Sequence, residues 1–145
     1  MARYHAIVGS PRSAAETFGY LARVSNARYW DPGVVRARQL DPGLVDVGTR
    51  FRLTISFLGL RLPLVYTVTR YAPPVTLVLR ASNRLLTATD TIELTTDQSG
   101  TVVSYLAEIT LRGPGQIFEP ALTAVFLRVA PRAVAGLADA LNAVT

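Results

Sequence analysis

Residues 100–141 read GTVVSYLAEITLRGPGQIFEPALTAVFLRVAPRAVAGLADAL, and the hydrophobic period changes within this stretch. Over residues 101–112 polar and apolar side chains alternate, which predicts a strand with one buried face. After Gly113-Pro114-Gly115 the apolar side chains recur at helical spacing as far as Leu141. The pattern predicts a helix of about 27 residues, ~40 Å long at ~1.5 Å per residue, which Pro131 kinks or restarts.

The residues before this stretch predict a series of strands. The predicted strands lie at residues 4–8, 34–40, 49–57, 61–71, 76–82 and 86–95, and 101–112 is the last. Turns are predicted at Asp41-Pro42-Gly43, Leu58-Gly59-Leu60, Ala72-Pro73-Pro74, Asn83-Arg84 and Asp97-Gln98-Ser99-Gly100. Two short helices are predicted between the first two strands. One begins with Ser10 as its N-cap and Pro11 at its first helical position, and the other covers residues 22–29.

These elements define a fold class. Antiparallel strands with short connections form a curved sheet with one dry face. The long C-terminal helix is the only predicted element large enough to cover that face. We therefore predict an α+β protein in which a seven-stranded curved antiparallel sheet wraps around the C-terminal helix, as a single domain over residues 1–145.

Composition excludes several kinds of chemistry. The chain has no cysteine, which rules out disulfides and thiolate catalysis, and one histidine, which rules out a histidine metal cluster. The absence of lysine also rules out a P-loop. We expect no metal and no cofactor. We expect His5, on the first strand, to be a surface or structural residue.

Charge and hydropathy limit the partners. All fifteen basic residues are arginines, scattered from Arg3 to Arg132, so the net charge of +5 does not indicate nucleic-acid binding. The N-terminus lacks the apolar core of a signal peptide. Glu119, Arg128 and Pro131 interrupt the apolar C-terminal stretch, so we expect no stable membrane insertion. A cytoplasmic monomer or homodimer is the expectation.

Several segments resemble a known superfamily. SPRSAAETFGYLARVSNARYW (10–30) is similar to its first helical segment, WDPGVVRARQL (30–40) and VGTRF (47–51) to its second and third strands, and GTVVSYLAEITLRG (100–113) to its last strand. The superfamily is the START-like, or SRPBCC, group of helix-grip proteins, which includes polyketide cyclases and small lipid-binding proteins. The resemblance covers nearly the whole chain and implies the helix-grip fold. It carries over no catalytic residues.

Asp90 stands out on the predicted strand 86–95. Strand alternation turns its side chain inward, onto an otherwise apolar face. An ionised carboxylate in a dry interior is unfavourable unless it is paired. Asp90 is therefore either a structural partner of Arg70, Arg84 or a tyrosine hydroxyl, or a ligand anchor or general base in a cavity.

Other residues are expected to surround the same inner face. Trp30 either rims a cavity entrance or plugs the core where helix meets sheet. Alternation on the strands and helical spacing after residue 116 select the rest. The candidate ligand-binding residues are Trp30, Phe51, Tyr66, Arg70, Tyr105, Phe118, Leu122 and Phe126, with Asp90 as the candidate catalytic residue.

Three functions fit these predictions. The first is binding of a hydrophobic small molecule, lipid or polyketide-like, between sheet and helix. The second is a polyketide cyclase or dehydrase in which Asp90 is the base and Tyr66, Tyr105 or Arg70 are the donors. The third is partner binding, as in a co-chaperone, through the outer face of the sheet or the long helix; the threonine-rich outer face of the sheet argues against it.

Overall fold

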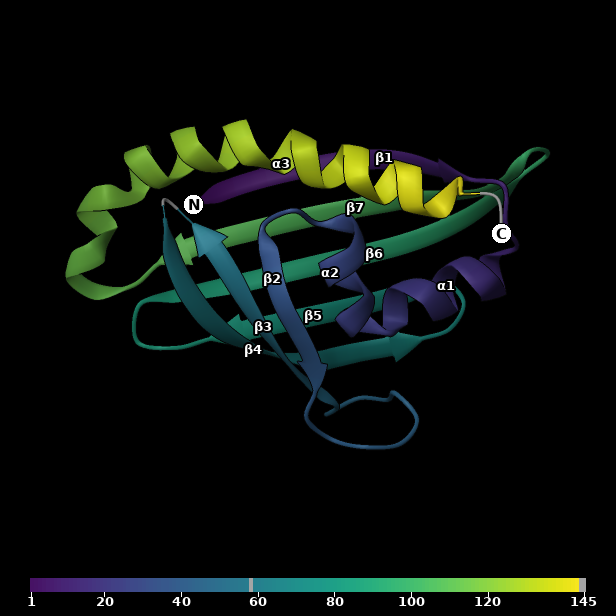
Figure 1. Cartoon of the computed structure of the whole chain (residues 1–145), viewed down its shortest axis with the longest axis horizontal. Coiled ribbons are helices and arrows are strands. Elements are labelled where there is room, and N and C mark those ends of the chain that lie inside the picture. The colour runs from purple at the N-terminus through teal and green to yellow at the C-terminus, as the bar shows by residue number, and fades with distance from the viewer. Residues whose placement is uncertain (58, 144–145) are drawn as a thin grey trace.

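The computed structural model describes residues 1–57 and 59–143, and these residues form a curled sheet with helices inside its curve (Figure 1). The elements in chain order are β1 (Ala2–Ser10), α1 (Ala14–Ala22), η1 (Val24–Asn26), α2 (Ala27–Trp30), β2 (Val34–Gln39), β3 (Arg50–Phe57), β4 (Leu60–Ala72), β5 (Thr76–Ser82), β6 (Leu86–Asp97), β7 (Gly100–Leu111), η2 (Gly113–Phe118) and α3 (Glu119–Leu141). Leu58, in the predicted turn at 58–60, lies outside the described residues.

Strands β2 to β7 form an antiparallel meander, and β1 is added to it as an edge strand beside β7. Among the described residues the sheet has seven strands in the order β1-β7-β6-β5-β4-β3-β2, and every neighbouring pair is antiparallel. The helix α3 packs along β1, while α1, η1 and α2 join β1 to β2 on the same side of the sheet (Figure 1). The predicted helix-grip α+β fold is confirmed.

The first helix begins three residues later than predicted. Ser13, not Ser10, is the N-cap: its Oγ accepts a hydrogen bond from the Glu16 backbone N–H at 3.1 Å and lies 3.1 Å from Glu16 Oε1. Ser10 still belongs to β1, and its buried hydroxyl is hydrogen-bonded to Thr17 Oγ1 at 2.9 Å. The N-cap prediction was wrong because Ser10 and Ser13 are similar cap candidates and only tertiary packing separates them.

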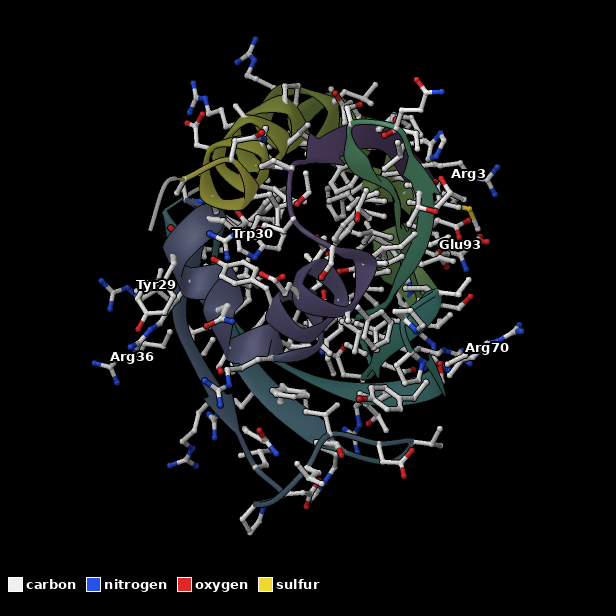
Figure 2. The ribbon with its side chains drawn as sticks, turned by 90° about the vertical axis from the view of Figure 1, so that its right-hand side faces the viewer. Arg3, Tyr29, Trp30, Arg36, Arg70 and Glu93 are labelled. Atoms are coloured by element: carbon white, nitrogen blue, oxygen red, sulfur yellow. The ribbon has the colours of Figure 1, made fainter. Side chains whose placement is uncertain are left out.

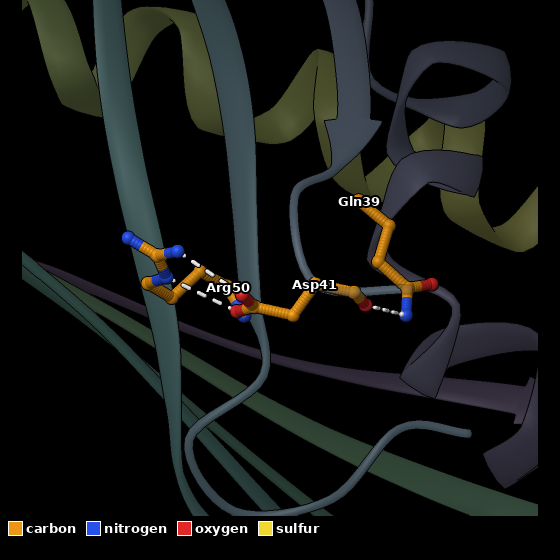
Figure 3. Close-up of polar contacts among 3 residues, drawn as sticks. All are labelled: Gln39, Asp41 and Arg50. Carbon is orange, nitrogen blue, oxygen red and sulfur yellow. Dashed lines mark hydrogen bonds and ion pairs between the residues drawn. The ribbon is translucent and has the colours of Figure 1, made fainter. Parts of the chain in front are cut away.

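The long connection between β2 and β3 is held by a local ion pair (Figure 3). Arg50 donates from Nε and Nη2 to the two carboxylate oxygens of Asp41, each at 3.0 Å, and this pairing lowers the pKa of Asp41. Gln39 Nε2 donates to the Asp41 carbonyl at 2.6 Å. The contacts lie at the end of the sheet away from α3, so they shape the loop and not the interior (Figure 1).

The helix α3 is continuous. It contains 23 residues and runs through Pro131, so the helix does not restart at this proline, and the kink, the other predicted outcome, stays a prediction. Its start at Glu119 is tied down because Glu119 Oε2 lies 2.5 Å from the N-terminal ammonium and Oε1 accepts from the Leu111 N–H at 2.6 Å. Gly136 lies against the carbonyl of Trp30, where a Cβ would be 1.9 Å from that oxygen. The glycine thus allows α3 to touch the end of α2.

Residues 113–141 are long and apolar enough, by length and composition, to cross a membrane. In the fold this segment instead lies along β1, with Leu137 and Leu141 in the core and Arg128 and Arg132 exposed. Only 17% of the most apolar window of this segment is buried in the fold. The absence of stable membrane insertion stays a prediction.

Candidate functional site

A cavity of about 350 Å³ lies between α3 and the inner face of the sheet. Its walls come from β1, the α2–β2 turn, β3, β4, β6, β7 and α3. The lining is mostly apolar and includes Ala6, Val8, Ile55, Leu64, Ala107, Ile109, Phe126, Ala130, Ala133, Val134 and Leu137. Its exposed lining residues are Pro32, Ser56, Val129 and Arg132, so the cavity opens between α3, the α2–β2 turn and the end of β3.

Asp90 lies in the middle of β6 and lines the inner part of the cavity. β6 pairs without a register shift to β5 and β7, so no bulge turns Asp90 outward, and its predicted inward orientation is confirmed. Burial raises the pKa of this carboxyl from 3.8 to about 6; the hydrogen bond from Tyr105 opposes the rise and the charge of Asp31 adds to it. The interior therefore holds an acid that is ionised at neutral pH at an energetic cost.

Two tyrosines and the tryptophan accompany Asp90. The Tyr105 hydroxyl donates to Asp90 Oδ2 at 2.7 Å, and the Trp30 ring meets the Tyr105 ring edge-on, with centroids 6.0 Å apart and planes at 74°. Burial, followed by the charge of Asp90, raises the pKa of Tyr66 and of Tyr105 well above the ordinary value. Both phenols therefore stay protonated and remain hydrogen-bond donors at neutral pH.

Polar atoms in the cavity are left without partners. Among the residues that the structure describes, none forms a hydrogen bond with Asp90 Oδ1 or with the Tyr66 hydroxyl, and neither atom is fully buried. No ion pair of the described residues involves Asp90. Of the structural partners considered from the sequence, Tyr105 is the one found, since Arg70 and Arg84 are exposed.

Sequence reasoning missed Asp31. It follows Trp30 at the end of α2, and its Oδ1 accepts from the Gly33 N–H at 2.8 Å. Its side chain lines the same cavity as Asp90, and burial raises its pKa. The Asp31-Pro32-Gly33 turn signal was visible in the sequence, but only the α2–α3 contact shows that this turn borders an interior space.

Half of the eight predicted ligand-binding residues line the cavity. Trp30, Tyr66, Tyr105 and Phe126 do so, and Figure 2 shows Trp30 pointing toward the interior. Phe51 is fully buried in the core outside the lining. Leu122 is half-buried and also lies outside it. The ligand-binding role of each residue stays a prediction.

Arg70 points to solvent, contrary to the prediction (Figure 2). The register between β4 and β5 shifts between Val68 and Arg70, which leaves Thr69 as an extra residue on β4. The shift reverses the alternation that had placed Arg70 inside. Tyr71 takes the inward position instead, and the centroid of its ring lies 5.5 Å from the ring centroid of Phe18 on α1.

Phe118 was also predicted wrongly. It belongs to η2 rather than to α3, and its side chain is 62% exposed. The change from 3₁₀ to α geometry at Glu119 breaks the helical spacing on which the prediction rested. Phe118 lies outside the cavity lining.

A second hollow, of about 700 Å³, lies between the end of β1 and the C-terminal half of α3. It is larger, but its acidic residue, Asp97, is exposed in the β6–β7 hairpin. A third hollow, of about 60 Å³, shares Asp31, Tyr66, Asp90 and Tyr105 with the cavity of about 350 Å³ but is too small for a drug-sized ligand. The cavity of about 350 Å³ combines an apolar lining with buried polar groups, and those two features together mark ligand sites. We therefore place the candidate site there.

The comparisons with known proteins agree with this architecture. The family model "Polyketide cyclase / dehydrase and lipid transport" matches residues 1–142. The chain is therefore a member of the polyketide cyclase/dehydrase and lipid transport family, and the predicted superfamily is confirmed. Members of this family typically bind hydrophobic ligands or act as polyketide cyclases. No curated protein matches the chain.

Solved structures share the fold at low sequence identity. A START superfamily protein from Mycobacterium smegmatis has a TM-score of 0.76 at 10% identity, over 97% of this chain and 95% of the other. The Zhui aromatase/cyclase from Streptomyces sp. R1128 has a TM-score of 0.76 at 14% identity, over 96% of this chain and 92% of the other. The protein TTHA0849 from Thermus thermophilus has a TM-score of 0.76 at 11% identity, over 97% and 95%. At these identities the likeness shows the fold alone.

Proposed function

We propose that this protein binds a compact hydrophobic molecule, lipid or polyketide-like, in the cavity between the sheet and α3. The observation that carries the proposal is the apolar cavity of about 350 Å³ with Asp90, Tyr66 and Tyr105 on its inner wall. Ligand pockets of about 300–1,000 Å³ with a few polar groups in an apolar lining are typical of small-molecule sites. The volume is near the lower end of that range, which favours a fused-ring body over a long acyl chain.

A paired substitution on α3 tests this proposal. N-phenylnaphthylamine, a neutral apolar probe whose fluorescence rises in dry surroundings, is expected to bind saturably with one site per chain. Ala133 lines the cavity, whereas Ala124 on the same helix is exposed and lies outside the lining. Ala133→Leu fills cavity space and is expected to weaken probe binding about tenfold, a change of about 1.4 kcal/mol, while Ala124→Leu leaves binding unchanged.

The outcome that contradicts the proposal is also defined. If the probe fails to saturate, or if both leucine variants bind it as the unmodified protein does, the cavity is not the binding site. Thermal unfolding of both variants shows whether each is folded at the temperature of the titration. A monomer or homodimer in the cytoplasm remains our proposal for its state and location.

A cyclase or dehydrase reaction is the second candidate, and the pKa of Asp90 favours it. A carboxyl with a pKa of about 6 is well placed to take a proton near neutral pH. Tyr66, whose hydroxyl has no hydrogen-bond partner among the described residues, would donate to the developing oxyanion of an enolised substrate, while Tyr105 holds Asp90 through its single O–H. Arg70 is excluded as a donor because it is exposed. The test is cyclisation of a poly-β-ketone substrate by the unmodified protein and by Asp90→Asn. Loss of cyclisation in the variant would distinguish catalysis from binding alone, and unchanged turnover would show that Asp90 is not the base.

A further inference from the structure

The charged groups that line the cavity are unevenly placed. Asp90 and Asp31 both line the cavity, and they also line the neighbouring hollow of about 60 Å³. Asp90 Oδ1 has no hydrogen-bond partner among the described residues and is not fully buried. Arg132 is the single basic residue of the described lining, and it is exposed at the opening. The inner end of the cavity therefore offers carboxylate oxygens, and among the described residues no cation of the protein neutralises Asp90 there.

Such an interior discriminates between ligand headgroups. A carboxylate placed beside Asp90 would bring two like charges together in a poorly solvated space, which is strongly unfavourable. A neutral hydroxyl would donate one hydrogen bond to Oδ1. An ammonium group would donate a charge-assisted hydrogen bond and would also offset the negative charge of Asp90 and Asp31.

We propose that the cavity selects ligands that combine a compact apolar body with a protonated amine, and that the amine binds Asp90 Oδ1. The inference rests on the proposed binding function and names its ligand class. The apolar body fills the space between α3 and β7. Asp31, whose Oδ1 is already bonded to the Gly33 N–H, adds long-range attraction for the cation.

Three probes on one ring system test this inference. Naphthylmethylamine, naphthylmethanol and naphthoate carry an ammonium, a hydroxyl and a carboxylate group on the same body. At pH 7.5, isothermal titration is expected to show the amine binding about tenfold more tightly than the alcohol, because a charge-assisted hydrogen bond is stronger than a neutral one. Naphthoate is expected to bind most weakly.

The same titration with Asp90→Asn assigns the cause. The preference for the amine over the alcohol is expected to disappear, while the affinity for the alcohol changes less than threefold. If Asp90→Asn still prefers the amine, the inference is overturned. It is also overturned if naphthoate binds the unmodified protein as tightly as the amine does. In that case, Arg132→Gln shows whether naphthoate binds at the opening of the cavity. Tight alcohol binding without an amine preference overturns this inference alone. Binding of none of the three probes, in a protein that does not bind N-phenylnaphthylamine either, overturns the proposed function as well.

Discussion

Replacing Asp90 with asparagine is expected to stabilise the protein by about 3 kcal/mol at pH 7.5 and to have little effect at pH 4. The carboxyl has a pKa of about 6 in the folded protein against an ordinary value of 3.8. Since one pKa unit corresponds to about 1.36 kcal/mol, the ionised form is disfavoured in the fold by about 3 kcal/mol. Asparagine fills nearly the same volume without a charge.

The sign of the pH dependence follows from proton uptake. Between pH 3.8 and about 6 the folded chain holds the Asp90 proton and the unfolded chain has lost it. The stability contributed by this residue therefore falls as the pH rises through that window, and it is constant above and below. Asp90→Asn removes this dependence, so the difference between the two proteins grows from pH 4 to pH 6.5.

Urea unfolding at a series of pH values measures this difference. Asp139→Asn, which removes an exposed carboxyl on α3, controls for the loss of one negative charge from a basic protein. If Asp90→Asn destabilises the protein equally at pH 4 and pH 7.5, the Asp90 carboxylate is a structural requirement of the fold. That result would contradict the claim that Asp90 is ionised inside the cavity at a cost in folding free energy.

Gly136→Ala is expected to destabilise the protein by about 3 kcal/mol. The new Cβ would lie 1.9 Å from the Trp30 carbonyl oxygen and 3.0 Å from its carbon, and backbone atoms cannot rotate away as a side chain does. Overpacking of this kind typically destabilises a protein by about 1–3 kcal/mol. Because α3 and α2 must separate to relieve the contact, the opening of the cavity beside Trp30 is also expected to change.

Gly19→Ala is the matched control. Gly19 lies within α1, is exposed and has no atom within 4 Å of an added Cβ. The same substitution there is expected to stabilise the protein by about 0.5–1 kcal/mol, since alanine favours the helix and restricts the unfolded chain. Changes of opposite sign in the free energy of unfolding of the two variants, measured in urea, would support the α2–α3 contact. A Gly136→Ala protein as stable as the unmodified one would show that the two helices do not touch there.

The sheet was predictable because alternation held along most strands. On β6 the residues Ala88, Ile92 and Leu94 are buried as predicted, and Asp90 lies on the same face. Alternation fails at Arg70 because a bulge inserts one residue into β4, and no side-chain pattern in the sequence distinguishes the two registers. A single extra residue was enough to move a predicted donor from the cavity to the surface.

The candidate site was less predictable than the sheet because it depends on contacts between distant elements. Tyr105 on β7 is hydrogen-bonded to Asp90 on the neighbouring strand β6. From the sequence, a tyrosine hydroxyl was only one of several possible partners for Asp90. Asp31 lines the cavity next to Trp30, whose carbonyl lies against Gly136 of α3. Neither contact has a local sequence signal.

Methyl NMR with N-phenylnaphthylamine tests the central claim, that a ligand occupies the space under α3, most directly. The account predicts that saturating probe shifts the methyl signals of cavity residues, such as Ala107, Ala133 and Ile55, and leaves those of the exposed Val47 and Val75 unchanged. Shifts confined to exposed methyl groups, or no shifts at a concentration that saturates the fluorescence, would contradict it.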